Sequence, residues 1–239
     1  MKNQFFKILL FGCFCFLTIT SSVGNVTPSL YIPDEGDETA NAESTVGTAN
    51  SLLLGDLSSV DCKELKAYSS DYGVDYRLIL AMIKQESQFD ENAVSEKGAR
   101  GLMQIMPVTN SELSAELDLQ ETQLPHQNII TGIYYFSKLY DLFNGAERED
   151  RLRLALAAYN AGPSRVYDAQ ELAAYLGENP SRWSAIQHTL PLLSKRYYSL
   201  HESVWGDIKP PAGYFGSCRQ TTGYVDAVMK NYAQYSAGS

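Results

Sequence analysis

Apolar side chains recur every three or four residues along most of the chain after residue 60, which is the spacing of amphipathic helices. The pattern predicts helices at residues 61–72, 76–88, 127–143, 150–160, 164–176, 181–188 and 222–235. No stretch alternates apolar and polar residues for long enough to predict a full sheet. We therefore expect an all-α fold, or an α fold with a minimal β element.

Several helix boundaries are marked by residues with special backbone preferences. Asp75 can cap the helix at 76–88, because its side chain can accept from the first unpaired N–H groups. Pro107 suits the first turn of a further helix. Gly162 and Pro163 predict a clear stop after Ala161, since glycine favours the end of a helix and proline cannot continue it.

The first sixty residues have a different composition from the rest. Residues 1–22 carry Lys2 and Lys7, then an apolar run that is too short for a confident membrane span, then small residues, as in an export signal. An alternative is that Cys13 is a lipidation site and anchors the chain to a membrane. Residues 23–60 are polar and predict a disordered linker. This leaves 61–239 as one folded domain.

Charge and cofactor signals exclude several functions. The formal net charge is −9 and no run of Lys and Arg occurs outside the N-terminus, so nucleic-acid binding is not expected. His126, His188 and His201 are scattered and form no metal-binding motif. We expect no metal or cofactor, and a monomer.

Glu86 is the candidate catalytic residue. It falls on the same helix face as Ile79, Met82 and Ile83, near the end where helix carbonyls carry partial negative charge. Both surroundings disfavour the ionised carboxylate, so we expect a raised pKa and a side chain that can act as a general acid. The alternative is a helix-end carboxylate exposed to solvent.

Ordered motifs surround this glutamate. They are E-S-x-F at 86–89, S-x-x-G-A-x-G-L-M-Q at 95–104, A-Y-N-A-G at 158–162 and Y-V at 224–225. Together they resemble the lytic transglycosylases, which cleave the glycan of bacterial peptidoglycan. The segment 167–198 is similar to the F-type membrane-bound branch of that family.

The resemblance implies a lysozyme-like, goose-type helical domain over 61–239 and a mechanism that needs one acid. Glu86 would protonate the bond between N-acetylmuramic acid and N-acetylglucosamine, then take a proton from the C6 hydroxyl, which closes a 1,6-anhydromuramyl end. The other positions carried over by motif are expected to bind substrate: Ser95, Met103, Gln104, Tyr159, Asn160 and Tyr224.

Two alternatives to this activity remain open from the sequence. One is a goose-type muramidase, which would use the same acid with water as the nucleophile. The other is a catalytically silent protein that binds peptidoglycan. In each case the expected partner is the glycan strand, and the expected location is the cell envelope, either periplasmic or associated with the outer membrane.

Two further features concern the cysteines and a set of aromatic residues near the C-terminus. Cys62 and Cys218 are the cysteines left for the folded domain, and an oxidising compartment makes them a disulfide candidate; two separate thiols are the alternative. In the Gly- and Pro-rich segment 203–217, Trp205, Tyr214 and Phe215 could either stack on sugars or pack the loop against the domain.

Overall fold

The computed structural model describes residues 62–119 and 124–237, and these residues are mostly helical. The expected leader, the lipidation site at Cys13 and the expected linker lie outside the described residues. The α-helices are α2 (Cys62–Asp71), α3 (Tyr76–Glu86), α4 (Pro107–Glu116), α5 (Pro125–Leu142), α6 (Arg148–Ala161), α7 (Pro163–Tyr175), α8 (Trp183–Thr189), α9 (Tyr198–Trp205) and α10 (Cys218–Ala237). Two 3₁₀ helices, η1 (Leu190–Leu193) and η2 (Lys195–Tyr197), precede α9.

The minimal β element is confined to the loop between α3 and α4. Isolated antiparallel bridges pair Val94 with Arg100, and Arg100 with Ile105. No longer strand forms in the part of the chain that the structure describes. The expected all-α class with a minimal β element is confirmed.

Helix α3 is the most deeply buried segment near the N-terminal end of the domain. Its residues 78–83 are all buried, so the helix packs on every side rather than along one stripe. Asp75 caps it as expected, and its carboxylate accepts from the Arg77 backbone N–H at 2.9 Å. The Tyr232 hydroxyl of α10 donates to the same carboxylate at 2.8 Å, which fixes α10 to the start of α3.

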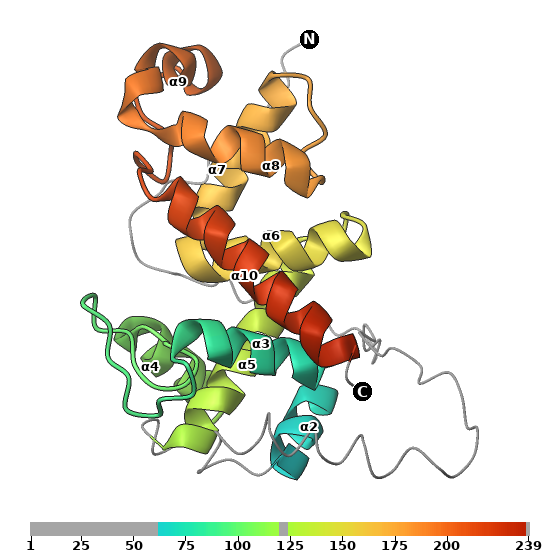
Figure 1. Ribbon diagram of the computed structural model, residues 1–239. Helices are drawn as coiled ribbons and strands as arrows, with labels where there is room; N and C mark the ends of the chain where they lie inside the picture. Colours follow the sequence, from blue (N-terminus) through green and yellow to red (C-terminus); the bar gives the residue numbers. More distant parts are fainter. Residues whose placement is uncertain (1–61, 120–123, 238–239) are drawn as a thin grey trace, which may run out of the picture.

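Helix α10 holds the two ends of the domain together. In Figure 1 it runs obliquely from the region of α7 and α8 to the region of α2 and α3. It contacts α3, α6 and η1 on the way. Helix α6 contacts α5, α7, α8 and α10, and the end of α6 meets the start of α10 through Asn160 and Thr221. This meeting point is where the candidate acid lies.

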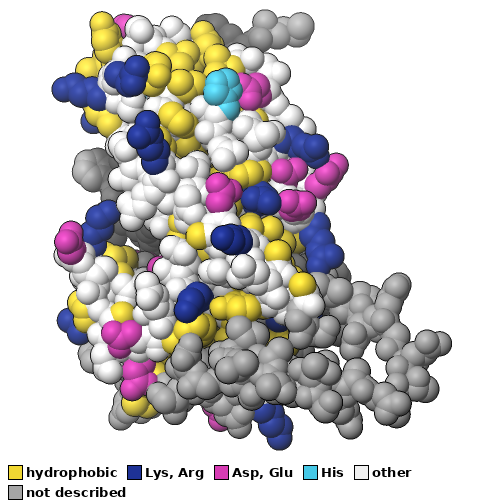
Figure 2. All heavy atoms as spheres, viewed as in Figure 1, with side chains coloured by type: hydrophobic (Ala, Val, Ile, Leu, Met, Phe, Trp, Pro, Cys, Tyr) yellow, Lys and Arg dark blue, Asp and Glu magenta, His cyan; other side chains and the backbone are white. Residues whose placement is uncertain are grey.

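The surface carries no continuous basic patch on the face that Figure 2 presents. Lys and Arg side chains there are separated by acidic, apolar and other polar groups. This agrees with the net charge of −9. None of the helices in the described residues is both long enough and apolar enough to cross a membrane.

The apolar pattern located most helices to within a few residues but missed two. Helix α4 was signalled only by Pro107, because its sequence has almost no apolar stripe and only Leu113 and Ser114 are buried. Helix α9 falls at the edge of the segment expected to be loop, and of its residues only His201 is buried. The apolar periodicity is weak in both helices because they lie on the outside of the domain and bury few side chains.

Candidate active site

Glu86 is the last residue of α3, and the backbone turns sharply after it. Ser87 caps the helix end, with its backbone N–H and its hydroxyl both donating to the Ile83 carbonyl. Gln88 and Phe89 then adopt left-handed conformations with φ of 53° and 68°. Residues other than glycine rarely adopt the left-handed conformation. Two such residues in succession store backbone strain next to the candidate acid.

The carboxyl of Glu86 is in an environment that favours its protonated form. Burial raises its pKa from 4.5 to about 7, and the nearby Tyr224 hydroxyl partly opposes this by stabilising the charge. No other described carboxylate contributes to the shift. The shift thus comes from burial and not from a like-charged neighbour, and the role of Glu86 as the catalytic acid stays a prediction.

Tyrosine hydroxyls flank this acid from two helices. Tyr224 of α10 is 6% exposed, and its hydroxyl makes no hydrogen bond of normal length and angle to a described residue. The Tyr224 hydroxyl lies close enough to Glu86 for the two groups to affect each other's pKa, but it does not meet the distance and angle of a hydrogen bond. Burial and the neighbouring Glu86 carboxylate raise the pKa values of both Tyr224 and Tyr159. Both therefore stay protonated and can serve as hydrogen-bond donors.

Tyr159 connects α6 to the loop after α3. Its hydroxyl donates to the Met103 carbonyl at 2.8 Å. Its ring lies 5.3 Å from that of Tyr135, measured between centroids, in a tilted arrangement. The partner of the Tyr159 hydroxyl is therefore a backbone group of the loop between α3 and α4 rather than a side chain.

Asn160, the next residue, faces α10. Its side-chain oxygen accepts from the Thr221 hydroxyl at 2.9 Å, and Thr221 is 1% exposed. This contact places the end of α6 against the start of α10. Tyr159 and Asn160 thus fix two different neighbours from adjacent positions.

The loop residues predicted to bind substrate make mostly internal contacts. Gln104 has a left-handed backbone with φ of 48°, and its side-chain amide donates to the Ala93 and Gly101 carbonyls at 3.0 Å each. The exposed Ser95 accepts from the Ala99 N–H through its hydroxyl at 3.0 Å. These contacts hold the loop in one shape, and they leave other atoms of both side chains available.

Met103 is placed differently from a groove-lining side chain. It is fully buried, and it packs so closely on Gly132 that a Cβ at that position would come within 2.7 Å of Met103. The Met103 backbone connects the loop to the rest of the domain, because its N–H donates to Asn128 and its carbonyl accepts from Tyr159.

Asn128 is a positioning residue that sequence reasoning missed. Its side-chain oxygen accepts from the Met103 N–H at 2.8 Å, and its amide donates to the Arg100 carbonyl at 3.0 Å. Gly101 has φ of 76°, and a Cβ there would lie 2.7 Å from the Asn128 side chain. The available sequence signal was the position of Asn128 itself, a polar residue one helical turn before Gly132 and on the same face of α5.

The Gly- and Pro-rich segment before α10 is packed down. Phe215 is 7% exposed, and the Tyr214 hydroxyl donates to the Ile208 carbonyl at 3.0 Å. The Trp205 indole N–H donates to Glu171. Of the two alternatives raised for these aromatic residues, the structure favours packing.

The cysteine pairing stays a prediction. Cys218 is half-buried and has no disulfide partner among the described side chains, while the Cys62 side chain lies outside them. In the described residues no group of His, Cys, Asp and Glu side chains is arranged to hold a metal ion.

The described residues fold as a lysozyme-like helical domain, with the half-buried Glu86 at the end of α3. Residues 64–180 match the family model described as Transglycosylase SLT domain, so this part of the chain is similar to that family.

Relatives that match the chain have consistent names. The membrane-bound lytic murein transglycosylase F of Desulfosudis oleivorans is 41% identical over 130 residues, which cover 53% of this chain and 27% of that protein. The protein of the same name from Haemophilus influenzae is 37% identical over 128 residues, covering 53% of this chain and 26% of the relative. The chain thus matches about a quarter of the length of these relatives.

Solved structures share the fold. The 70 kDa soluble lytic transglycosylase SLT70 of Escherichia coli matches with a TM-score of 0.52 and 25% identity, covering 79% of this chain and 26% of that one. The lytic transglycosylase Slt of Pseudomonas aeruginosa, solved as an inactive mutant with glutamine in place of a glutamate, matches with a TM-score of 0.52 and 27% identity over 77% of this chain and 25% of that one.

Proposed function

We propose that this protein is a peptidoglycan lytic transglycosylase and that Glu86 is its acid and base. The observation that carries the proposal is the partly buried Glu86 carboxyl at the end of α3, whose pKa burial raises to about 7 and which no second carboxylate is found to perturb. Glycosidases that use an enzyme nucleophile or activate water generally place two carboxyls at the scissile bond. One acid suits a reaction in which the sugar supplies the nucleophile.

In the proposed reaction, protonated Glu86 donates its proton to the glycosidic oxygen between N-acetylmuramic acid and N-acetylglucosamine. The C1–O bond breaks, and the 2-acetamido group of the muramyl residue stabilises the positive charge at C1. The resulting Glu86 carboxylate then takes the proton of the muramyl C6 hydroxyl, while the C6 oxygen forms a bond to C1. No water is consumed, and the product is a 1,6-anhydromuramyl end.

Neighbouring residues support this chemistry in different ways. Tyr224 has a buried hydroxyl without a normal hydrogen bond, so it can donate to the carboxylate form of Glu86 or to the reacting sugar. Ser95 and Gln104 lie on the loop that faces the substrate in this proposal. Met103 acts through its backbone, which positions Tyr159. Asn160 acts through its contact with α10.

The test is the activity of Glu86→Gln on purified peptidoglycan, with mass spectrometry of the released fragments. We expect wild type to release anhydro products, each one water lighter than the hydrolysed fragment, and the variant to lose nearly all activity. Glu96→Gln is the matched control, because Glu96 is an exposed glutamate on the adjacent loop. The relative solved as an inactive glutamate-to-glutamine mutant supports this choice of substitution.

The same experiment separates the alternatives. Hydrolysed ends from wild type would identify a muramidase. Binding to peptidoglycan without any released fragment would identify a silent binding protein. Full activity of Glu86→Gln would reject the assignment of the acid.

For location we propose export to the cell envelope, with the periplasm as the compartment and attachment through Cys13 as the alternative to a cleaved leader. The names of the membrane-bound relatives support an envelope location. Fractionation of cells that express wild type or Cys13→Ala tests this. An anchored form is lost from the membrane fraction in the variant, and a cleaved form is soluble in both cases.

A further inference from the structure

Helix α10 carries Tyr224, and the position of this helix controls how the Tyr224 hydroxyl meets Glu86. The two groups interact, but the hydroxyl does not reach the distance and angle of a hydrogen bond. Such a contact is sensitive to small movements, because hydrogen bonds weaken steeply as their geometry departs from the ideal. A slight shift or rotation of α10 therefore decides how well Tyr224 supports the Glu86 carboxylate.

A hydrogen bond far from the acid sets the register of α10 against α3. The Tyr232 hydroxyl of α10 donates at 2.8 Å to the carboxylate of Asp75, the residue that caps the start of α3. At the other end of α3, Glu86 lies beside Tyr224, which is about two turns before Tyr232 on α10. The two helices therefore run antiparallel. Figure 1 shows the C-terminal half of α10 beside α3, and this helix pair has the most extensive contact among the described residues.

Asp75 is a fixed anchor for this hydrogen bond. Its carboxylate also accepts from the Arg77 side chain at 2.9 Å and from the Arg77 backbone N–H at 2.9 Å. An ionised acceptor held at the cap of α3 makes a strong hydrogen bond and cannot follow a movement of α10. Burial and the bond to Asp75 raise the pKa of Tyr232 to about 12, so Tyr232 stays a donor well above neutral pH.

A second hydrogen bond holds α10 on the other side of Tyr224. Thr221 lies one turn before Tyr224, is 1% exposed, and donates to the Asn160 side-chain oxygen at 2.9 Å. Thr221, Tyr224 and Tyr232 share one face of α10, because they are spaced by whole turns. Anchors before and after Tyr224 fix both the rotation of the helix and its position along its axis.

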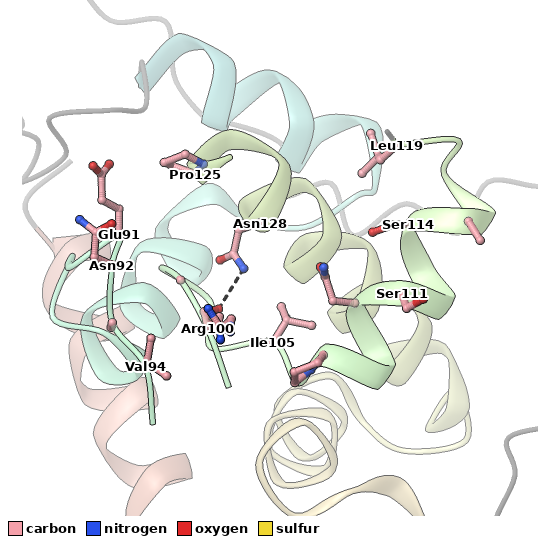
Figure 3. A pocket seen from close by; sticks show the side chains of 15 residues that line it. Glu91, Asn92, Val94, Arg100, Ile105, Ser111, Ser114, Leu119, Pro125 and Asn128 are labelled. Carbon is pink, nitrogen blue, oxygen red and sulfur yellow. Dashed lines mark hydrogen bonds between the residues drawn. The ribbon is translucent and has the colours of Figure 1, made fainter. Parts of the chain in front are cut away.

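The loop on the other side of Glu86 is held independently of α10. Asn128 of α5 donates to the Arg100 carbonyl at 3.0 Å, the dashed line in Figure 3, and accepts from the Met103 N–H. The described residues that line the pocket drawn in Figure 3 come from this loop and from α4 and α5, and none belongs to α10. A displacement of α10 would therefore move Tyr224 and leave the loop in place.

We infer that Tyr232 and Thr221 are positioning residues for the reaction, which hold α10 so that the Tyr224 hydroxyl faces Glu86. The inference rests on the proposed function, because that function makes Glu86 the acid. Tyr224 is the described side chain whose hydroxyl opposes the rise in the pKa of Glu86. Tyr159 also interacts with Glu86, but the Met103 carbonyl holds its hydroxyl. A role limited to stability would leave the protonation of Glu86 unchanged.

The kinetic test is the pH profile of full-length Tyr232→Phe and Thr221→Val on soluble glycan strands. Loss of either hydroxyl should let Tyr224 move away from the acid, so that the Glu86 carboxylate is stabilised less. The pH at which kcat falls by half should then be higher than in wild type. At low pH we expect kcat to be about three- to tenfold lower with KM unchanged, since a weaker acid donates its proton less readily.

Conservative variants separate this effect from a loss of fold. Thr221→Ser keeps the hydroxyl and should restore the wild-type profile. Thr222→Val is the matched control on the same helix, because the Thr222 hydroxyl donates to the Arg219 carbonyl within α10. Tyr175→Phe, at a 54% exposed position of α7, is the control for Tyr232→Phe. Both controls should match wild type.

A double-mutant cycle shows whether Tyr232 acts through Tyr224. Tyr224→Phe alone should lower kcat at least as much as Tyr232→Phe does. Adding Tyr232→Phe to Tyr224→Phe should change neither kcat nor the pH profile further, because the hydroxyl that Tyr232 would position is already absent. Additive effects of the two substitutions would overturn the inference.

A measurement without substrate separates this inference from the proposed function. Titration of the Glu86 carboxyl by ¹³C NMR, with the signal assigned from Glu86→Gln, should give a higher pKa in Tyr232→Phe and Thr221→Val than in wild type. Wild type that releases no fragment from peptidoglycan would reject the proposed function, while the titration would still show whether these residues position Tyr224. An equal Glu86 pKa in wild type and both variants would overturn the inference.

Discussion

The Tyr159 hydroxyl donates a 2.8 Å hydrogen bond to the Met103 carbonyl, which joins the end of α6 to the loop that follows the acid. Replacing Tyr159 by Phe leaves this carbonyl without its partner. We expect the free energy of unfolding to fall by about 1–2 kcal/mol. We also expect kcat/KM to fall by about tenfold or more, because small displacements at an active site have large kinetic costs. Chemical denaturation and a peptidoglycan digestion assay measure the two effects.

The matched control for this prediction is Tyr135→Phe. The Tyr135 ring packs on the Tyr159 ring in a tilted arrangement, and phenylalanine retains this ring. No hydrogen bond of the Tyr135 hydroxyl is found among the described contacts. The loss of stability should therefore be smaller than in Tyr159→Phe. Equal losses in the two variants would show that the Met103 contact has no special importance.

The loop between α3 and α4 should depend on Asn128 in the same way. Replacing Asn128 by Ala removes two hydrogen bonds to the loop backbone, at Met103 and Arg100, and leaves space beside Gly101. We expect the free energy of unfolding to fall by about 2–4 kcal/mol, since buried backbone groups lose their partners. Hydrogen exchange should report faster exchange at the Met103 amide. An unchanged exchange rate there would contradict the positioning role.

The sequence predicted the helix that ends at Glu86 and singled out Tyr159 and Tyr224, which the structure places near Glu86, because these features depend on local spacing and on motifs. It did not reveal Asn128, whose role depends on contacts with residues 25 and 28 positions earlier in the chain. The sequence also suggested that Met103 binds substrate, whereas its side chain is fully buried against Gly132 and its backbone makes hydrogen bonds across the domain. Which atom of a residue is used depends on tertiary packing, and the spacing of apolar positions carries no information about it.

The pH dependence of the reaction should follow the protonation of Glu86. The carboxyl must carry its proton to begin the reaction, and burial places its pKa at about 7. Since a general acid is active below its pKa, kcat/KM should fall as pH rises through about 7. A profile measured on peptidoglycan between pH 5 and about 9 checks this. A rate that stays constant across that range would exclude Glu86 as the proton donor.

The same burial should make Glu86 destabilising at alkaline pH. Its pKa is raised from 4.5 to about 7 in the folded protein, so the stability of the protonated form is present below 4.5 and is lost as pH rises through 7. Glu86→Gln cannot ionise. It should be more stable than wild type by up to about 3 kcal/mol at pH 9, at about 1.4 kcal/mol for each pKa unit, and similar to wild type at pH 4. Glu96→Gln should show no such trend.

Asp168 is a second buried carboxyl, away from the candidate acid, and it should respond to pH in the same direction. It is 4% exposed and accepts from the Ala212 N–H at 2.9 Å, which holds the loop before α10. Burial is the main cause that raises its pKa to about 6, with the nearby Glu171 adding to it. The stability contributed by the protonated side chain is thus lost as pH rises from about 4 through 6.

Asp168→Asn keeps an oxygen that can accept from Ala212 and removes the charge, so we expect the variant to be more stable than wild type by about 1–3 kcal/mol at pH 8 and equal to it near pH 4. Thermal unfolding at both pH values, with the exposed Glu202→Gln as the control, measures the difference. A variant that is less stable than wild type at pH 8 would mean that the ionised carboxylate is the form that the loop requires.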